Sequence, residues 1–202
     1  MSAQRMARPG KAGGEAAGKP AGKAFGAEGP EGPQGTHGMQ GPERTERVSA
    51  PPLGLELLWR GGRLAGLRLT RAEASHLEPD ASPEARALHA ALLRLGQHRP
   101  ADFPPLPLAW ELVPPFTRQV LETLLARVGH GQRVTYGELA RLAGHPGKAR
   151  AVGQAMARNP WPLIVPCHRV LGAGGCLTGY TNPHGLPLKE LLLQMESGPA
   201  RD

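Results

Sequence analysis

The residues with the clearest chemical potential lie in the last third of the chain, in the run Ile164–Val170, IVPCHRV. One of only two cysteines, Cys167, stands there between a proline and His168. A cysteine attacks as its thiolate, and a neighbouring histidine backed by a carboxylate is the usual means of lowering a thiol pKa. Glu196 is available as that carboxylate. The pattern predicts a nucleophilic cysteine, and an inert buried cysteine beside a structural histidine is the alternative.

A zinc site is a third interpretation of the same region. Cys167, His168, Cys176 and His184 all carry suitable ligand atoms. No C-x-x-C or H-x-x-x-H spacing pairs them, although zinc sites commonly show such spacings. We therefore expect no metal.

Composition narrows the setting in which this chemistry takes place. Two cysteines cannot form a disulfide framework, and no apolar run at the start suits a signal peptide or a membrane span, so a cytoplasmic location is expected. The chain has 24 Lys and Arg against 17 Asp and Glu. Between Arg127 and Arg169 there are seven basic residues and a single acid, Glu138. Positive charge concentrated around the motifs favours a polyanionic partner.

The first part of the chain is predicted to divide into a tail and a small domain. Residues 1–50 hold 11 Gly and 5 Pro, which predicts a disordered tail. Within the tail, glycine recurs every third residue from Gly26 to Gly41, as in collagen, but six triplets are very short for a triple helix. Residues 51–107 are expected to form a small α/β domain with an antiparallel sheet.

The pattern of that small domain supports a hairpin and a helix. In LELLWRGGRLAGLRLT, alternating apolar residues flank Gly61-Gly62, which predicts a two-residue turn between two strands. Leu88, Leu92 and Leu95 then share one helical face. The proline-rich FPPLPL, residues 103–108, is expected to close the domain as an extended connector.

Residues 108–197 are predicted to form a second, mostly helical domain, with residues 198–202 as a tail. Thr117 is the expected cap of a first helix, and Thr135 with Glu138 forms a capping box for a short second one. Pro146 is expected to open a third helix, which Asn159-Pro160 stops. The second and third helices across a glycine-containing turn describe a helix-turn-helix. Pro187 is expected to open the last helix, with Glu196 just past its apolar stripe.

The third helix, GKARAVGQAMAR, has almost no bulky side chains, and two arginines project from it. Small side chains permit a close approach of the backbone to a partner. Tight helix packing is one explanation, and contact with a phosphate backbone is the other. A major-groove reader usually carries Asn, Gln or Arg arrays, so this helix suits contact without base-by-base reading.

Taken together, these motifs resemble the O6-alkylguanine-DNA alkyltransferases, or methylated-DNA-protein-cysteine methyltransferases. The similarity runs from about Phe116 to Glu196, and PCHRV within it is highly specific. The resemblance implies an α+β protein: a small N-terminal α/β domain, then a helix-turn-helix, winged-helix-like alkyltransferase domain. It also implies DNA repair by direct reversal without any cofactor. The alkyl group of O6-alkylguanine moves once to a cysteine that is not regenerated. O4-alkylthymine is a second expected substrate.

The resemblance assigns catalytic roles to five residues. Cys167 matches the alkyl acceptor. His168 matches the histidine that relays the thiol proton through water, and Glu196 matches the carboxylate that completes the relay. Tyr136 matches the tyrosine that protonates the departing guanine and lines its pocket. Asn159 matches the asparagine that braces the strand segment before the cysteine and the helix-turn-helix.

The resemblance also implies contacts with double-stranded DNA through its minor groove. Arg150 matches the arginine that fills the stack after the damaged base is rotated out, and extrusion is needed because a paired base cannot present its alkyl group. The expected DNA contacts are Lys148, Ala149, Arg150, Ala151, Gly153 and Arg158. The expected pocket residues are Pro162, Tyr180 and Thr181. The family usually has GY-x-GGL in this loop, whereas this chain reads GYTNPHGL, with Pro183 and His184 added.

The sequence therefore predicts a monomeric, cytoplasmic suicide methyltransferase, associated with the nucleoid if the protein is bacterial. A non-catalytic protein that flags damage is one rival, but those relatives carry tryptophan at the cysteine position. A helix-turn-helix transcription factor would need base-reading side chains on its recognition helix. A cysteine hydrolase would need an oxyanion hole, which no motif identifies.

Overall fold

The computed structural model describes residues 41–101, 103–179, 182 and 184–197. The elements are β1 (Glu43–Ala50), β2 (Leu53–Arg60), β3 (Arg63–Arg71), β4 (His76–Leu77), α1 (Pro83–Gly96), η1 (Trp110–Leu112), α2 (Pro115–Arg127), β5 (Val134–Thr135), α3 (Tyr136–Leu142), α4 (Ala149–Ala157), η2 (Cys167–Arg169), β6 (Val170–Leu171), η3 (Ala173–Gly175) and α5 (Gly185–Ser197). None of the helices in these residues is both long enough and apolar enough to cross a membrane. Most of the expected disordered tail (residues 1–40) and residues 198–202 lie outside the described residues.

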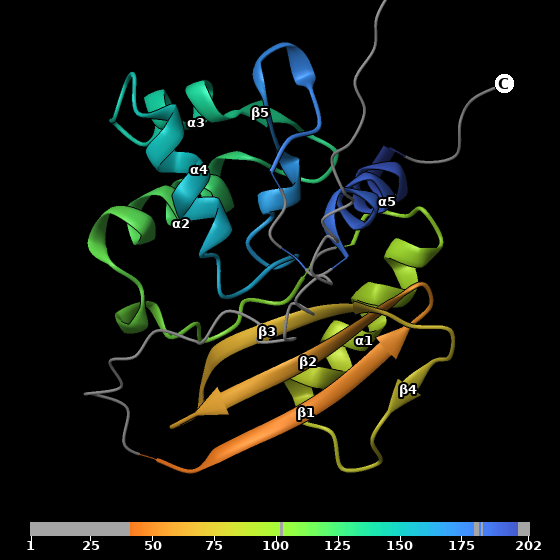
Figure 1. The fold of residues 1–202 in the computed structure, drawn as a ribbon. Coiled ribbons are helices and arrows are strands. Elements are labelled where there is room, and N and C mark those ends of the chain that lie inside the picture. Colours follow the sequence, from red (N-terminus) through yellow and green to blue (C-terminus); the bar gives the residue numbers. More distant parts are fainter. Residues whose placement is uncertain (1–40, 102, 180–181, 183, 198–202) are drawn as a thin grey trace, which may run out of the picture. The chain divides into compact units, whose positions relative to one another are not determined.

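An antiparallel sheet of order β3-β2-β1-β4 forms the first part of the fold (Figure 1). The expected hairpin is confirmed: β2 and β3 pair around Gly61 and Gly62, whose φ angles of 53° and 75° suit a two-residue hairpin turn. The expected helix is also confirmed as α1, whose apolar face packs against the sheet. The alternating apolar residues of the strands and the apolar residues at i, i+3 and i+4 of α1 thus form one shared core.

The prediction that the tail extends to residue 50 is wrong, because residues 43–50 form β1. This strand is polar, so its sequence lacks the apolar alternation of its neighbours. It is stabilised by backbone pairing with β2 along its full length. The carboxylate of Glu46 also accepts hydrogen bonds from Ser82 N at 2.7 Å and Ser82 Oγ at 2.9 Å, at the start of α1. The small domain therefore starts earlier than the expected boundary at residue 51.

The second part of the fold is mostly helical, as expected. Helix α2 begins at Pro115, not at the predicted Thr117 cap, because proline fits the first helical turn and Thr117 is buried inside the helix. The capping box of Thr135 and Glu138 at the start of α3 is confirmed. Helix α4 begins at Ala149 and not at Pro146, since Gly147 with φ of 80° interrupts helical geometry.

Helices α3 and α4 pack together as the predicted helix-turn-helix, and α2 packs against α4. A short parallel pair, β5 with β6, links the start of α3 to the segment after Cys167. The last helix, α5, begins at Gly185, two residues before the expected Pro187, and contacts η2. The α+β fold class is confirmed.

Candidate active site

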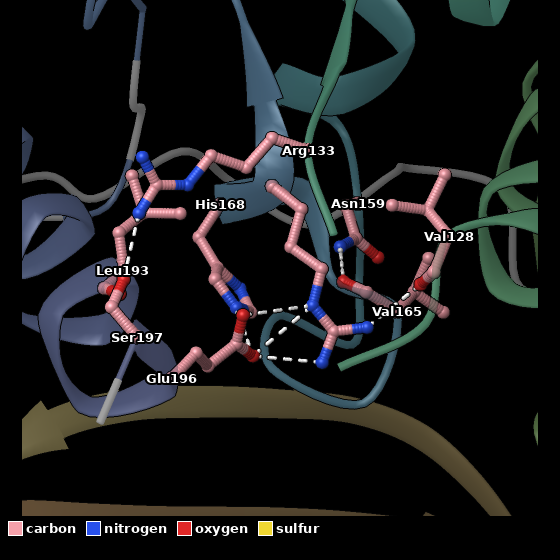
Figure 2. Close-up of polar contacts among 9 residues, drawn as sticks. Val128, Arg133, Asn159, Val165, His168, Leu193, Glu196 and Ser197 are labelled. Atoms are coloured by element: carbon pink, nitrogen blue, oxygen red, sulfur yellow. Dashed lines mark hydrogen bonds and ion pairs between the residues drawn. The ribbon is translucent and has the colours of Figure 1, made fainter. Parts of the chain in front are cut away.

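Cys167 lies at the start of the 3-10 helix η2, directly before β6. Pro166 precedes it, and the Cys167 amide donates to the Val165 carbonyl at 2.8 Å. The Asn159 side chain holds the same carbonyl, because its Nδ2 donates to Val165 O at 2.9 Å. Figure 2 shows Asn159 directed at Val165. Asn159 thus braces the turn that carries the cysteine, in agreement with the expected geometry.

Cys167 is 6% exposed, and burial raises the pKa of its thiol above the ordinary value. A hydrogen bond from the Asn159 side chain and the positive charge of Lys189 act in the opposite direction without reversing the shift. Burial therefore outweighs the neighbouring groups, and the net shift of the thiol pKa is upward, opposite to the expected lowering. The cysteine rests as a neutral thiol and must lose its proton during the reaction.

His168 is fully buried and oriented by Glu196. Its Nε2 lies 2.9 Å from Glu196 Oε1 (Figure 2). Burial lowers the pKa of His168 despite the contact with this carboxylate, so the ring is neutral at pH 7. A neutral ring that donates from Nε2 leaves Nδ1 as an acceptor. Nδ1 is buried and has no hydrogen-bond partner among the described residues, so it is free to take a proton.

The carboxylate of Glu196 is shared between His168 and Arg169. Arg169 Nη2 lies 2.7 Å from Glu196 Oε1, its Nε donates to both oxygens at 3.1 Å, and its Nη1 donates to Val128 O at 2.7 Å. Burial alone would raise the pKa of Glu196, but the hydrogen bonds and charges of His168 and Arg169 lower it to about 2. Because Arg169 is always charged, Glu196 stays ionised while His168 is neutral. Arg169 thus holds Glu196 in place and links it to the backbone of Val128.

Tyr136 is half-buried at the first position of α3, and its hydroxyl lies 3.3 Å from the carbonyl oxygens of Thr178 and Gly179. Burial raises the pKa of Tyr136, and the negative charge that Cys167 carries when it is ionised raises it further, so the Tyr136 hydroxyl keeps its proton. A Cβ added at Gly153 of α4 would lie 3.9 Å from the Tyr136 ring. The Tyr136 side chain therefore lies between α4 and the loop after β6.

The sequence analysis missed Lys189, which is fully buried on α5. Its Nζ donates to Val170 O at 2.7 Å and Thr178 O at 2.9 Å, and lies 5.9 Å from the centre of the Tyr136 ring. Burial lowers its pKa, and the nearby Cys167 opposes that shift. A signal existed in the sequence: Lys189 and Glu196 are seven residues apart and share a helical face.

The candidate DNA-binding residues lie on and around α4. Val152, Ala155 and Met156 face the core, whereas Lys148, Arg150 and Arg158 are exposed. These three basic residues form no ion pair with any residue that the structure describes. The small residues Ala149, Ala151 and Gly153 are partly exposed. The arrangement thus places basic side chains that have no ion-pair partner in the described part of the chain beside small, partly exposed residues of α4.

The candidate pocket residues are only partly described. Pro162 is half-buried in the turn before Cys167, where it forms a bridge with Val165. Tyr180 and Thr181 lie outside the described residues.

Comparison with known proteins connects this geometry to one family. Residues 115–198 match the model of the 6-O-methylguanine DNA methyltransferase DNA-binding domain. A methylated-DNA-protein-cysteine methyltransferase of Rattus norvegicus is 43% identical over 126 residues, which are 60% of this chain and 60% of that protein. One of Mycobacterium bovis is 34% identical over 155 residues, 76% of this chain and 93% of that protein. The chain thus spans well under two thirds of the rat protein but nearly all of the mycobacterial one.

Solved structures give the same assignment over both parts of the fold. The crystal structure of Mycobacterium tuberculosis O6-methylguanine methyltransferase has a TM-score of 0.60 and 33% identity, covering 79% of this chain and 96% of that one. The structure of Mycobacterium tuberculosis OGT in complex with DNA has a TM-score of 0.59 and 33% identity, covering 78% and 95%. With the buried Cys167, His168 and Glu196 in place, this chain belongs to the methylated-DNA-protein-cysteine methyltransferase family.

Proposed function

We propose that this protein repairs DNA by moving the alkyl group of O6-alkylguanine, and of O4-alkylthymine, to Sγ of Cys167. The observation that carries the proposal is the buried series Cys167, His168 and Glu196, in which His168 Nδ1 is an acceptor without a partner in the described part of the chain. When a neutral thiol passes its proton to a neutral imidazole, a thiolate and an imidazolium form as a pair, so neither charge is buried in isolation.

The proton path follows from the ionisation states. The thiol proton moves through a bridging water to Nδ1 of His168, and the ionised Glu196 stabilises the imidazolium that forms. Sγ then attacks the alkyl carbon, the S–C bond forms, and the C–O6 bond breaks with its electron pair going to guanine. Tyr136, whose hydroxyl is protonated at rest, donates its proton to the guanine ring. The proton held by the His168 imidazolium then returns through water to the Tyr136 oxygen, so the proton lost by the thiol is balanced by the one gained by guanine.

The products explain why each molecule acts once. Guanine gains the proton that the thiol loses, and Cys167 ends as a thioether with no further proton to give. The reaction needs no cofactor, because the leaving group is activated by proton transfer alone.

DNA recognition is proposed to be sequence-independent and to use the minor groove. The exposed Lys148 and Arg158 fit phosphate contacts, and the small Ala149, Ala151 and Gly153 fit close approach of α4. Arg150, exposed and without an ion-pair partner among the described residues, fits insertion into the stack when the damaged base is extruded. We further propose that the protein works as a monomer in the cytoplasm, at the nucleoid if it is bacterial.

Methyl transfer from a labelled duplex tests the proposal. A duplex with one O6-[³H]methylguanine is mixed with excess protein, and label in protein is counted over time. Wild type and Cys176→Ser should take up all the label, because Cys176 is exposed and outside the buried series. Cys167→Ser should take up none. Tight binding of the damaged duplex by wild type without uptake would instead indicate a protein that only recognises damage.

A further inference from the structure

A tryptophan joins the cysteine-bearing turn to the sheet. Trp161 is fully buried six residues before Cys167, and its indole Nε1 donates to the Leu64 carbonyl of β3 at 2.8 Å. Its ring meets that of Trp110 edge-on, with centroids 4.7 Å apart. The preceding residue is held as well, because Leu67 N donates to Pro160 O at 2.8 Å.

Strand β3 can make these contacts because it is an edge strand. In the order β3-β2-β1-β4, only one side of β3 is paired within the sheet. Its other side presents backbone groups that need partners. Ala109 N and the Trp161 indole share the Leu64 carbonyl, at 3.0 and 2.8 Å. The segment between α4 and Cys167 is thus hydrogen-bonded to the edge of β3 that faces away from β2.

A continuous set of hydrogen bonds leads from Trp161 to the cysteine. Trp161 N donates to Asn159 Oδ1 at 3.0 Å, and Val165 N donates to Trp161 O at 2.9 Å. The carbonyl of Val165 receives both Asn159 Nδ2 at 2.9 Å and Cys167 N at 2.8 Å. A shift of Trp161 therefore displaces Asn159 and the Val165 carbonyl together.

The turn between Trp161 and Val165 also contains a strained residue. Leu163 has a φ of 77°, a left-handed conformation that is costly for a leucine. Such a conformation persists only where its surroundings hold it in place. The contacts of Trp161 with β3 on one side and of Asn159 with Val165 on the other supply that restraint.

We propose that Trp161 is a positioning residue for alkyl transfer: its indole N–H fixes the Trp161–Val165 turn on β3 and, through Asn159, sets the position of Cys167. The proposal deepens the function proposed above and rests on it. The N-terminal sheet then serves the reaction directly, as the support against which the nucleophile is aligned. Asn159 acts to lower the pKa of the Cys167 thiol, so displacing Asn159 from its place beside the turn disfavours the thiolate, and this is the measurable consequence.

The test compares Trp161→Phe with Trp59→Phe, both in a Cys176→Ser background so that Cys167 is the only thiol. Trp59 is a matched control, because it is 4% exposed in the same sheet and its Nε1 has no partner among the described residues. Two readouts are taken: the single-turnover rate of methyl transfer from an O6-methylguanine duplex, and the pH midpoint of Cys167 alkylation by iodoacetamide.

Trp161→Phe should slow methyl transfer about tenfold, the effect of losing one hydrogen bond that orients the nucleophile, and should move the midpoint to higher pH. Trp59→Phe should change neither. If both variants change alike, or if Trp161→Phe leaves both readouts at wild-type values, the proposal is wrong. Failure of wild type to transfer methyl would remove the proposed function, whereas the iodoacetamide midpoint reports on positioning without DNA.

A second replacement covers the case in which Trp161→Phe does not fold. Exchange of Trp161 for 3-benzothienylalanine keeps the bicyclic shape and the contact with Trp110 but replaces the N–H by sulfur. This protein should keep the wild-type melting curve within a few degrees and still show the slower transfer and the higher midpoint. Wild-type behaviour in both readouts would overturn the proposal.

Discussion

Glu196→Gln offers a stringent test of the electrostatics of the site. The Glu196 side chain is 2% exposed and is contacted by both His168 and Arg169. The lowering of its pKa from 4.5 to about 2 corresponds to about 3 kcal/mol of stability at neutral pH. Removing one member of a buried ion pair costs a similar amount, about 3–5 kcal/mol, because Arg169 is left uncompensated. The free energy of unfolding at pH 7 should therefore fall by about 3 kcal/mol or more.

The sign of the pH dependence gives a second, independent expectation. Because the pKa is lower in the folded state, the unfolded chain takes up the proton first as the pH falls. The stabilisation is complete above the unfolded pKa of 4.5 and is lost as the pH falls towards about 2. Wild type should lose about 3 kcal/mol over that window from this group, and Glu196→Gln should lack this component.

Urea unfolding followed by circular dichroism at a series of pH values between 7 and 2 measures both quantities. Glu190→Gln is the matched control, since Glu190 is an exposed residue on the same helix α5. This control should keep the wild-type stability at pH 7 and the wild-type loss in acid. A Glu196→Gln protein as stable as wild type at pH 7, with an unchanged acid profile, would refute the assignment of Glu196 as a buried, ionised partner of Arg169.

Four further predictions follow from the site. Lys189→Met should lower the free energy of unfolding by about 2 kcal/mol in urea titrations and slow methyl transfer, because the buried carbonyl of Val170 and the partly buried carbonyl of Thr178 lose a charged donor. Unchanged stability would contradict this. Gly153→Ala should stabilise α4 by up to about 1 kcal/mol yet weaken duplex binding in fluorescence anisotropy, and unweakened binding would argue against close approach. Lys148→Ala should reduce the slope of log affinity against log salt by about 1, and an unchanged slope would exclude a phosphate contact. Burial keeps the pKa of His168 below 6.5, so the transfer rate should stay constant from pH 8 to 6.5 and fall only at lower pH, where His168 becomes protonated. A fall in the rate already at pH 7.5 would contradict a neutral resting histidine.

Local signals in the sequence predicted much of the fold. The Gly61-Gly62 turn and the capping box of Thr135 and Glu138 depend on a few adjacent residues, and both are confirmed. Strand β1 could not be predicted in this way. It pairs along its length with β2, and its buried Glu46 is satisfied by Ser82 from a distant segment, so its sequence resembles that of a solvated tail.

The candidate site shows the same division between local and distant information. The PCHRV motif pointed to Cys167 and His168, and the contact of His168 with Glu196 agrees with the expectation. The neutral state of the thiol could not be predicted, because it results from burial by the whole fold. The role of Trp161 was equally hidden, since its partner is a backbone carbonyl at Leu64, far away in the chain.

The most direct measurement of the central claim is the mass of the protein after reaction with a duplex that carries one O6-methylguanine. The account predicts one added methyl group per protein molecule, located by peptide mapping on Cys167, with the exposed Cys176 unmodified. A methyl group on any other residue, or an unmodified protein bound to an unrepaired duplex, would contradict the claim that Cys167 is the alkyl acceptor.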